Sequence, residues 1–444
     1  MSTSTSTTTP TPPAAKPQAR TSTFASLSVR NYRLFFYGGL LSNTGTWMGR
    51  VAQTWLVLTI LTNNSATAVG YLAALQFLPM ALLGPWGGAV ADRFPKRTIL
   101  VWTQVLLSIN AGLLAVLVLT GTTQLWHVYA LALMLGAISA VDNPTRQAFA
   151  SEMVGPDLLP NAVGLNSASF NAARLVGPAV AGLLIAWWGV GPALVINALS
   201  FLPVIVALVA MNAAQLNPAP LRRGRGAVRE GFRYVAGRPD IQMIMFIVFM
   251  LGTFGMNFQI TNALMATEVY AVGADAYGVL GSVMAIGSLS AALLAARRPR
   301  PRLSMLLGAL AGFALSTTLL ALAPTYLTFA IMLVPVGLTA LTVMTTANAS
   351  VQLTTEPAVR GRVMALYMTI FLGGTPLGAP VIGWIGDAWG ARWTLLIGGI
   401  ASGIAFLIGM AFALRNNGWR LPSWRSLRGY PDPAPLDADE APTR

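Results

Sequence analysis

Residues 88–97 read Gly-Ala-Val-Ala-Asp-Arg-Phe-Pro-Lys-Arg and separate two long apolar runs. They place one acid, Asp92, and three bases, Arg93, Lys96 and Arg97, in a loop of only a few residues. The segments on either side have the composition of membrane-embedded helices. A short charged loop held between two such segments indicates a membrane transporter.

The chain as a whole has the composition of a membrane protein. It is 55% hydrophobic and 9% charged with a mean hydropathy of +0.63, whereas a soluble domain carries about 25% charged residues. Its apolar runs are continuous, which excludes the alternating pattern of a β-barrel. We expect an all-α membrane protein with twelve transmembrane helices, near residues 34–61, 68–91, 98–119, 124–148, 161–189, 191–212, 241–267, 277–296, 303–323, 324–349, 363–387 and 391–414.

Residues that carry metal or acid–base chemistry are scarce. The chain has no cysteine, and therefore no disulfide framework or thiolate metal site, and its single histidine, His127, lies at the start of the fourth span. It contains no P-loop, no Ser-His-Asp arrangement and no His-Glu-x-x-His pattern. We therefore expect no metal, no cofactor, no ATP-driven pumping and no enzymatic activity.

Basic residues are distributed unevenly. Most of the 28 Lys and Arg residues lie in the two tails or in alternate loops, and Arg392 lies in the other set of loops. The positive-inside rule then places both termini in the cytoplasm, which requires an even number of spans. Because the bases are spread over short loops next to the membrane, we expect contact with anionic lipids and no nucleic-acid binding.

The spans divide into two halves of six. Residues 24–212 and 241–414 form the halves, residues 213–240 form a basic cytoplasmic loop between them, and residues 1–23 and 415–444 are tails that we expect to be disordered. Within the central loop, residues 228–235 fit either a short amphipathic helix on the inner membrane face or a solvated linker.

The two halves contain an internal repeat. Aligning Gly177 with Gly378 also aligns Gly182 with Gly383 and Trp188 with Trp389, so the fifth and eleventh spans look like duplicates. A weaker echo pairs the loop at Arg93 with residues 297–302, which contain no acid. Such a parallel repeat is typical of transporters whose halves rock about a site near the midplane.

Twelve spans, a central basic loop and the loop at residues 88–97 together resemble the major facilitator superfamily. The family's loop pattern is matched at Gly88, Asp92, Arg93, Lys96 and Arg97, while a proline, Pro95, stands where the family has glycine. The resemblance implies that Asp92 latches the halves together on the cytoplasmic side while the protein is open outward. The alternative is that Asp92 only offsets the neighbouring bases.

Further strings resemble narrower groups within this superfamily. Gly177, Pro178 and Gly182 belong to a stretch similar to the motif of exporters and antiporters, in which such residues thin and bend the helix for close packing and gating. Residues 31–35, 142–149 and 360–365 look like the bacterial group that includes the enterobactin exporter and multidrug efflux proteins. The similarity covers residues 24–414.

Polar residues inside the spans are candidates for the substrate path. Arg50 and Arg174 each lie roughly 20 Å or more from the cytoplasmic end of their helix, at about 1.5 Å per residue. Charged residues at that depth usually face a cavity or a partner. The candidates for a polar substrate cavity are Asn43, Arg50, Gln53, Asn171, Arg174, Asn257 and Gln259. For the uncharged ones, the alternative is a hydrogen bond between helices.

Acids are rare inside the spans, which bears on the energy source and on the substrate. Asp142, at the cytoplasmic end of the fourth span, is the best candidate for proton coupling, and it could pair with Arg146 or Arg174. Proton coupling itself is implied by the resemblance. Because Arg50 and Arg174 would repel cations, the residues favour neutral or anionic substrates.

We expect a monomeric, multi-pass protein of the bacterial inner (plasma) membrane. It should export a small hydrophobic drug or siderophore-like molecule by alternating access, in antiport with protons. Two alternatives stay open. One is an importer or facilitator of a small metabolite on the same fold, and the other is a membrane sensor or scaffold that transports nothing.

Overall fold

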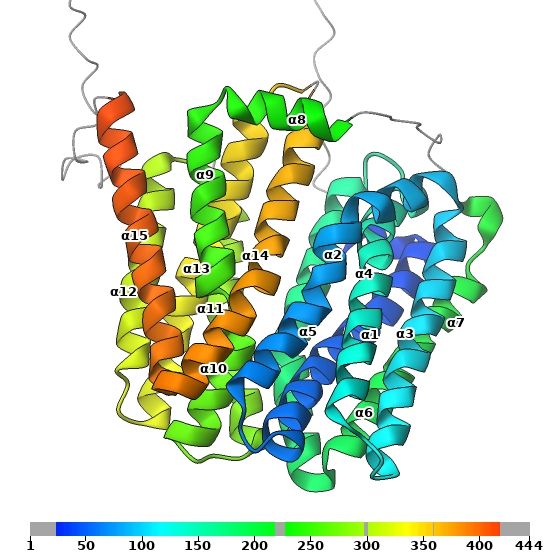
Figure 1. The fold of residues 1–444 in the computed structure, drawn as a ribbon. Coiled ribbons are helices and arrows are strands. Elements are labelled where there is room, and N and C mark those ends of the chain that lie inside the picture. The colour runs from blue at the N-terminus through cyan, green and yellow to red at the C-terminus, as the bar shows by residue number, and fades with distance from the viewer. Residues whose placement is uncertain (1–23, 218–226, 297–300, 358, 418–444) are drawn as a thin grey trace, which may run out of the picture.

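Long helices make up nearly all of the structure, a computed structural model that describes residues 24–217, 227–296, 301–357 and 359–417 (Figure 1). The predicted tail at residues 1–23 and most of the predicted tail at 415–444 lie outside the described residues. The first half contains α1 (Arg30–Trp55), α2 (Ala66–Arg93), α3 (Lys96–Leu119), α4 (Leu125–Met153), α5 (Leu159–Trp188), α6 (Val190–Ser200) and α7 (Leu202–Ala210).

The second half follows the same plan. It contains α9 (Pro239–Met250), α10 (Phe258–Leu264), α11 (Ala274–Ala296), α12 (Leu303–Ala321), α13 (Tyr326–Thr354), α14 (Arg360–Trp389) and α15 (Ala391–Asn417). Two spans are interrupted. α6 and α7 meet at Phe201, just before Pro203, which has no N–H to donate to the preceding turn. α9 and α10 are joined by a wide helical turn, Leu251–Gly255, and a second such turn, Met265–Val269, completes that span.

The helices form twelve spans in two halves, as the sequence predicted. In the described part of the chain, 11 helices are long and apolar enough to be recognised as spans by those two criteria. The helix that falls short is α1, because Asn43, Arg50 and Gln53 make it more polar. The wide turn Leu56–Leu61 continues α1 to the length of the other spans.

A short helix forms in the loop between the halves. α8 (Ala227–Ala236) covers the stretch for which the sequence allowed either a helix or a linker. It packs against α14, where Gly231 faces the backbone of Arg362. Phe232 and Arg233 are exposed on α8, which lies across the end of the second half (Figure 1).

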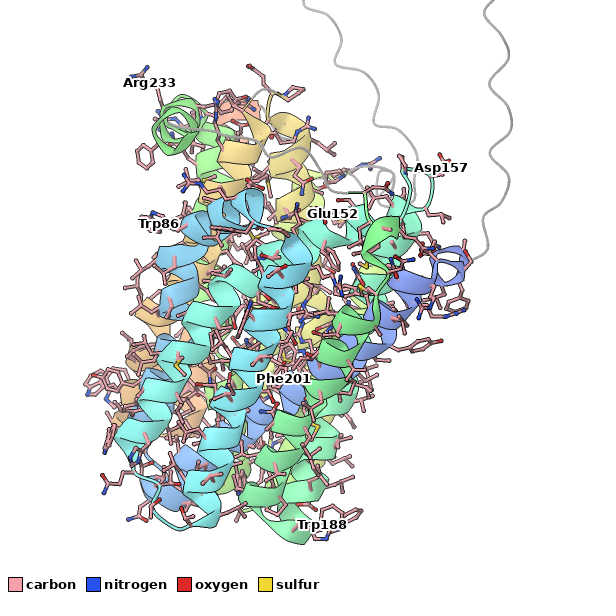
Figure 2. The ribbon with its side chains drawn as sticks, turned by 90° about the vertical axis from the view of Figure 1, so that its right-hand side faces the viewer. Trp86, Glu152, Asp157, Trp188, Phe201 and Arg233 are labelled. Atoms are coloured by element: carbon pink, nitrogen blue, oxygen red, sulfur yellow. The ribbon has the colours of Figure 1, made fainter. Side chains whose placement is uncertain are left out.

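The two ends of the bundle carry different loops. We call the end with α8 and the 93–97 loop the basic end, and the end with the α1–α2 turn at residues 62–65 the opposite end (Figure 1). Figure 2 shows Arg233 and Asp157 at the basic end and Trp188 at the opposite end. α2 runs toward the basic end and α14 runs away from it, so these two helices are antiparallel.

Two seams join the halves: α2 packs against α14, and α5 packs against α11. A Cβ atom at Gly70 would collide with the carbonyl oxygen of Ala379, and one at Gly182 would collide with that of Ala274. Small residues therefore let the helices touch backbone to backbone. The halves approach each other near the opposite end and diverge toward the basic end (Figure 1).

Candidate functional site

The bases of the 88–97 loop hold it to the first half. The ammonium group of Lys96, the first residue of α3, donates to the carboxylate of Glu152 on α4 at 2.6 Å, and both side chains are buried. Arg97 donates from Nε and Nη2 to two carbonyl oxygens at the end of α7, at 2.7 and 2.9 Å. Lys96 and Arg97 therefore anchor the loop instead of reaching toward the second half.

Asp92 and Arg93 are free of such contacts. Both side chains are exposed at the end of α2, and within the described residues Asp92 forms no hydrogen bond or ion pair. Gly88, one turn earlier, faces open space. In this conformation Asp92 does not join the halves, which diverge at its end, so its role as a latch stays a prediction.

Pro95 occupies the family's glycine position without backbone strain. Its φ is −59°, close to the value of about −65° that the ring imposes, and it immediately precedes α3. The positive φ angles in the described chain lie at other residues. The turn therefore does not require the conformational freedom of glycine at this position.

A buried acid lies within the first half. Oδ1 of Asp142 accepts hydrogen bonds from Thr103 Oγ1 at 2.6 Å and from Gln104 Nε2 at 2.8 Å. Its Oδ2 lies 3.3 Å from Nε of Arg146. Of the two arginines that the sequence offered as partners, Arg146 is therefore the one that pairs with Asp142, and Arg174 is not.

Arg174 and Arg50 instead share a tryptophan. The guanidinium carbons of Arg50 and Arg174 lie 5.3 and 5.6 Å from the ring centre of Trp47, and that of Arg50 lies 5.1 Å from the ring of Phe77. Within the described residues neither arginine forms an ion pair, and Nε of Arg50 is buried without a hydrogen-bond partner. Aromatic faces attract cations by about 0.5–2 kcal/mol but carry no net charge. Two half-buried positive charges therefore lack a counter-ion among the described residues.

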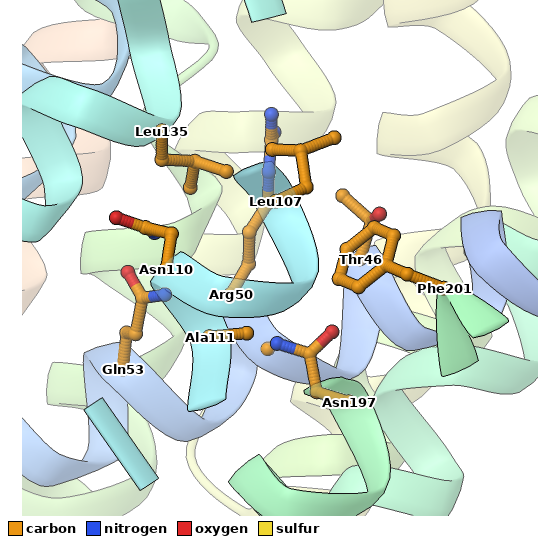
Figure 3. Close-up of a pocket in the computed structure, with 10 residues that line it drawn as sticks. Thr46, Arg50, Gln53, Leu107, Asn110, Ala111, Leu135, Asn197 and Phe201 are labelled. Atoms are coloured by element: carbon orange, nitrogen blue, oxygen red, sulfur yellow. The ribbon is translucent and has the colours of Figure 1, made fainter. Parts of the chain in front are cut away.

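A small pocket lies beside Arg50, inside the first half (Figure 3). Helices α1, α3 and α6 contribute its polar lining, which includes Gln53, Asn110 and Asn197. Oδ1 of Asn110 and Oδ1 of Asn197 are buried without a hydrogen-bond partner in the described chain. The pocket therefore extends the polar surroundings of Arg50 into the interior of the first half.

Two predicted cavity residues form hydrogen bonds with other glutamines or threonines. Gln53 accepts a hydrogen bond from Nε2 of Gln76 at 2.9 Å, within the first half. Gln259 donates to Oγ1 of Thr54 at 2.6 Å and so connects the second half to the first. The sequence had assigned Gln259 to a cavity, and the structure places it where the halves meet.

The other uncharged candidates have more local surroundings. Asn171 and Asn257 each donate to the carbonyl oxygen four residues earlier in their own segment, at 2.8 and 2.7 Å. Asn257 is buried, whereas Asn171 and Asn43 are half-buried. Whether these three residues contact a substrate stays a prediction.

The exporter-like stretch lies at the contact surface of α5. A Cβ atom at Gly177 would collide with Trp47, so this glycine lets α1 and α5 pack closely. The next residue, Pro178, and Gly182 both face Gly278 of α11 in the second half. The stretch therefore joins the helix that carries Trp47 to the seam between the halves, and its role in gating stays a prediction.

The contacts that close the opposite end were not predicted from the sequence. Asp387, near the end of α14, accepts hydrogen bonds from the backbone N–H groups of Ala66 and Thr67 at 2.6 and 3.0 Å. Trp55 of the first half stacks on Tyr277 of the second, with ring centres 5.8 Å apart. An acid at the end of a span looks like an ordinary loop residue, and the one sequence signal that could have pointed to this contact is Ser65, a typical N-cap residue directly before α2.

The chain matches a family model described as transmembrane secretion effector over residues 21–434. It is similar to the staphyloferrin A transporter of Staphylococcus aureus, with 24% identity over 382 residues that cover 83% of this chain and 93% of the relative. It is also similar to the enterobactin exporter of Shigella flexneri, with 24% identity over 326 residues that cover 72% of this chain and 76% of that protein.

Solved structures share the same architecture. A bacterial homologue of the human lysosomal transporter Spinster, in an inward-facing and unoccupied conformation, superposes with a TM-score of 0.70 at 15% identity, over 88% of this chain and 99% of that one. A D-xylose–proton symporter gives a TM-score of 0.68 at 14% identity, over 90% of this chain and 100% of that one. At such identities the likeness concerns the fold alone.

Proposed function

Because this chain belongs to the transmembrane secretion effector family of the major facilitator superfamily, we propose that it exports small anionic molecules of the siderophore type. It is a membrane transporter and not an enzyme. The relatives named for staphyloferrin A and enterobactin support a siderophore-like substrate.

The observation that carries the proposal is the pair of arginines around Trp47. Two guanidinium groups without a counter-ion repel each other and repel cationic substrates, and holding such charges half-buried within a span is costly. An anion bound between them would neutralise both charges, and the ring of Trp47 would offer an apolar face to the same molecule. Arg174 lies about 15 residues from the start of α5, which is roughly 22 Å from the basic end.

The proposed transport cycle follows from where the halves meet. The basic end faces the cytoplasm by the positive-inside rule, so the conformation described above is open toward the cytoplasm and closed at the outer face. Substrate would reach Arg50 and Arg174 from the cytoplasmic side. Rocking of the halves about the α2–α14 and α5–α11 seams would then open the outer end.

Asp142 is the residue that we propose for proton coupling. Its carboxylate is buried, the charged group facing it is Arg146, and Thr103 and Gln104 donate to it from α3. Gln104 also accepts a hydrogen bond from Ser42 of α1, so the acid is linked to the helix that carries Arg50. Protonation would remove the charge that holds Arg146.

Export from inverted membrane vesicles tests the proposal. Vesicles that contain the protein should accumulate staphyloferrin A, enterobactin or both, and should not accumulate a cationic dye. Arg50→Ala and Arg174→Ala should each reduce uptake at low substrate concentration at least tenfold, because a hydrogen bond to a charged group contributes about 1.5–3 kcal/mol. Arg233→Ala removes one positive charge from exposed α8 and should leave uptake unchanged.

Several results would contradict the proposal. Preferential movement of the cationic dye would reject the anionic substrate class. Accumulation of a metabolite by intact cells would favour the importer. Unchanged uptake after collapse of the proton gradient would reject proton coupling, and unchanged uptake in Asp142→Asn would reject Asp142 as the coupling residue. Asp157→Asn, which changes an exposed acid at the same end, is the control for Asp142→Asn.

A further inference from the structure

A carboxylate from one half caps a helix of the other half at the opposite end. Oδ1 of Asp387 accepts a hydrogen bond from the N–H of Ala66 at 2.6 Å, and Oδ2 accepts from the N–H of Thr67 at 3.0 Å and from Oγ of Ser65 at 3.2 Å. Ala66 and Thr67 are the first two residues of α2, whereas Asp387 belongs to α14. The bonds therefore hold the two halves together.

This contact is favourable for two physical reasons. The first N–H groups of a helix have no partner within it, and the helix dipole places partial positive charge at that end. A carboxylate that accepts from two such groups forms charge-assisted hydrogen bonds, which are about twice as strong as neutral ones. Rocking that opened the opposite end would break them.

The same helix pair carries a second acid in the mirrored position. Because α2 and α14 are antiparallel, the end of α2, with Asp92, and the start of α14, at Arg360, both lie at the basic end. Asp92 is exposed and has no partner among the described residues. One acid of the pair is thus engaged while the other is free.

The other seam lacks both acids. The internal repeat that aligns Gly182 with Gly383 places Ala186 of α5 in register with Asp387. Residues 297–302, the echo of the 93–97 loop, contain no acid either. Between α5 and α11 the structure has backbone packing instead, with Gly182 against Ala274. The acids placed to cap a helix of the other half therefore lie at the two ends of the α2–α14 pair, whereas Asp275, the acid at the α5–α11 seam, belongs to the first turn of its own helix α11.

We propose that Asp387 is the outer gate residue of the transport cycle: its cap on α2 holds the outer face closed and breaks when the halves rock toward the outward-open state, in which the resemblance has Asp92 latch the halves. The inference rests on the alternating access proposed above. The carboxylate of Asp387 favours the inward-open state, in which the outer face is closed. Asp92 favours the outward-open state, so the two acids shift the same equilibrium in opposite directions.

Distances between spin labels can measure that equilibrium. The native chain contains no cysteine, so pairs of cysteines can be introduced without removing others. Thr122→Cys with Leu322→Cys reports on the opposite end, and Asp157→Cys with Phe232→Cys reports on the basic end. All four positions are exposed; Thr122 and Asp157 lie in the first half, Leu322 lies in the second, and Phe232 lies on α8, which packs against α14 of the second half. The protein should be reconstituted in lipid nanodiscs without substrate.

Asp387→Asn should lengthen the distance across the opposite end and shorten the one across the basic end. We expect at least a tenfold rise in the ratio of outward-open to inward-open molecules, which corresponds to about 1.4 kcal/mol. Asp92→Asn should shift the ratio the other way. Asp275→Asn removes an exposed acid from the same end, which makes no hydrogen bond to the first half among the described residues, and should change nothing.

A second variant protects the test against misfolding. Ala66→Pro keeps Asp387 but removes one N–H donor, and proline is well tolerated at the first helical position. The preceding residue, Ser65, already has the extended conformation that proline requires, with φ −70° and ψ 111°. It should shift the distances in the same direction as Asp387→Asn, because the proline ring takes the place of the N–H group from which Asp387 accepts and displaces the carboxylate.

The outcomes separate this inference from the proposed function. Unchanged distances in Asp387→Asn, or in Ala66→Pro if only that variant folds, would overturn the outer gate. Changed distances in a protein that exports none of the tested substrates would keep the gate and reject the proposed function. If the wild-type protein exports a tested substrate and the Asp387→Asn variant keeps the wild-type distances, the proposed function stands and the outer gate is rejected.

Discussion

Replacing Lys96 by methionine tests how the charged loop is held to the first half. The change leaves the Glu152 carboxylate, whose side chain is only 7% exposed, without the ammonium group 2.6 Å away. Removing one partner of a buried ion pair costs about 3–5 kcal/mol, because the remaining charge is left uncompensated. The double variant Lys96→Met/Glu152→Met removes both charges and should lie within about 1 kcal/mol of the wild type, since apolar replacement of a buried pair is often neutral.

Equilibrium unfolding in mixed detergent micelles gives the free energies that this cycle needs. Arg93→Met is the matched control, because it removes a base from the same loop but at an exposed position, and it should change the free energy of unfolding by no more than about 0.5 kcal/mol. The reasoning would be refuted if Lys96→Met cost no more than Arg93→Met. It would also be refuted if the double variant were as unstable as Lys96→Met alone.

Three further predictions concern the seam and the loops. Gly182→Val should lower the rate of substrate uptake by vesicles at least tenfold, because the valine side chain would collide with the backbone of α11. Gly84→Val is the control, because Gly84 faces open space, and it should leave that rate unchanged. Arg238→Ala should reduce the free energy of unfolding by about 1 kcal/mol at most, because its bridge to Asp240 is partly exposed to solvent, even though hydrogen bonding to that acid raises the pKa of the Arg238 guanidinium. Ala271→Gly should raise that free energy by about 1 kcal/mol, since Ala271 has a φ of 51°, and thermal unfolding would detect it.

The architecture could be predicted because it depends on patterns along the chain. Continuous apolar runs long enough to cross a bilayer predicted the twelve spans, and the structure has helices at those positions. Even the first span was recognised from the sequence, although Arg50 and Gln53 make it more polar than the other spans. It is the span that the criteria of length and mean hydropathy leave out. Backbone hydrogen bonds must be satisfied within each segment in lipid, so composition alone decides the helices.

The candidate site could be predicted only in part. The sequence identified Arg50, Arg174 and Asp142 as unusual because charges inside spans are rare, and the structure joins the two arginines through Trp47. The sequence left the partner of Asp142 open, because Arg146 follows it by one turn on the same helix and Arg174 lies on the next helix. The contact of Gln259 with Thr54 could not be foreseen, because it depends on how two separate halves meet.

The sequence by itself therefore determined the membrane setting, the spans, the charged loop and the rare buried charges, all of which follow from residue composition within single segments. Only the tertiary structure decided which charges are paired: Lys96 with Glu152, Asp142 with Arg146, and Asp387 with the start of α2. Ion pairs and helix caps require atoms within about 3–4 Å, and segments distant in the sequence reach such distances only through packing.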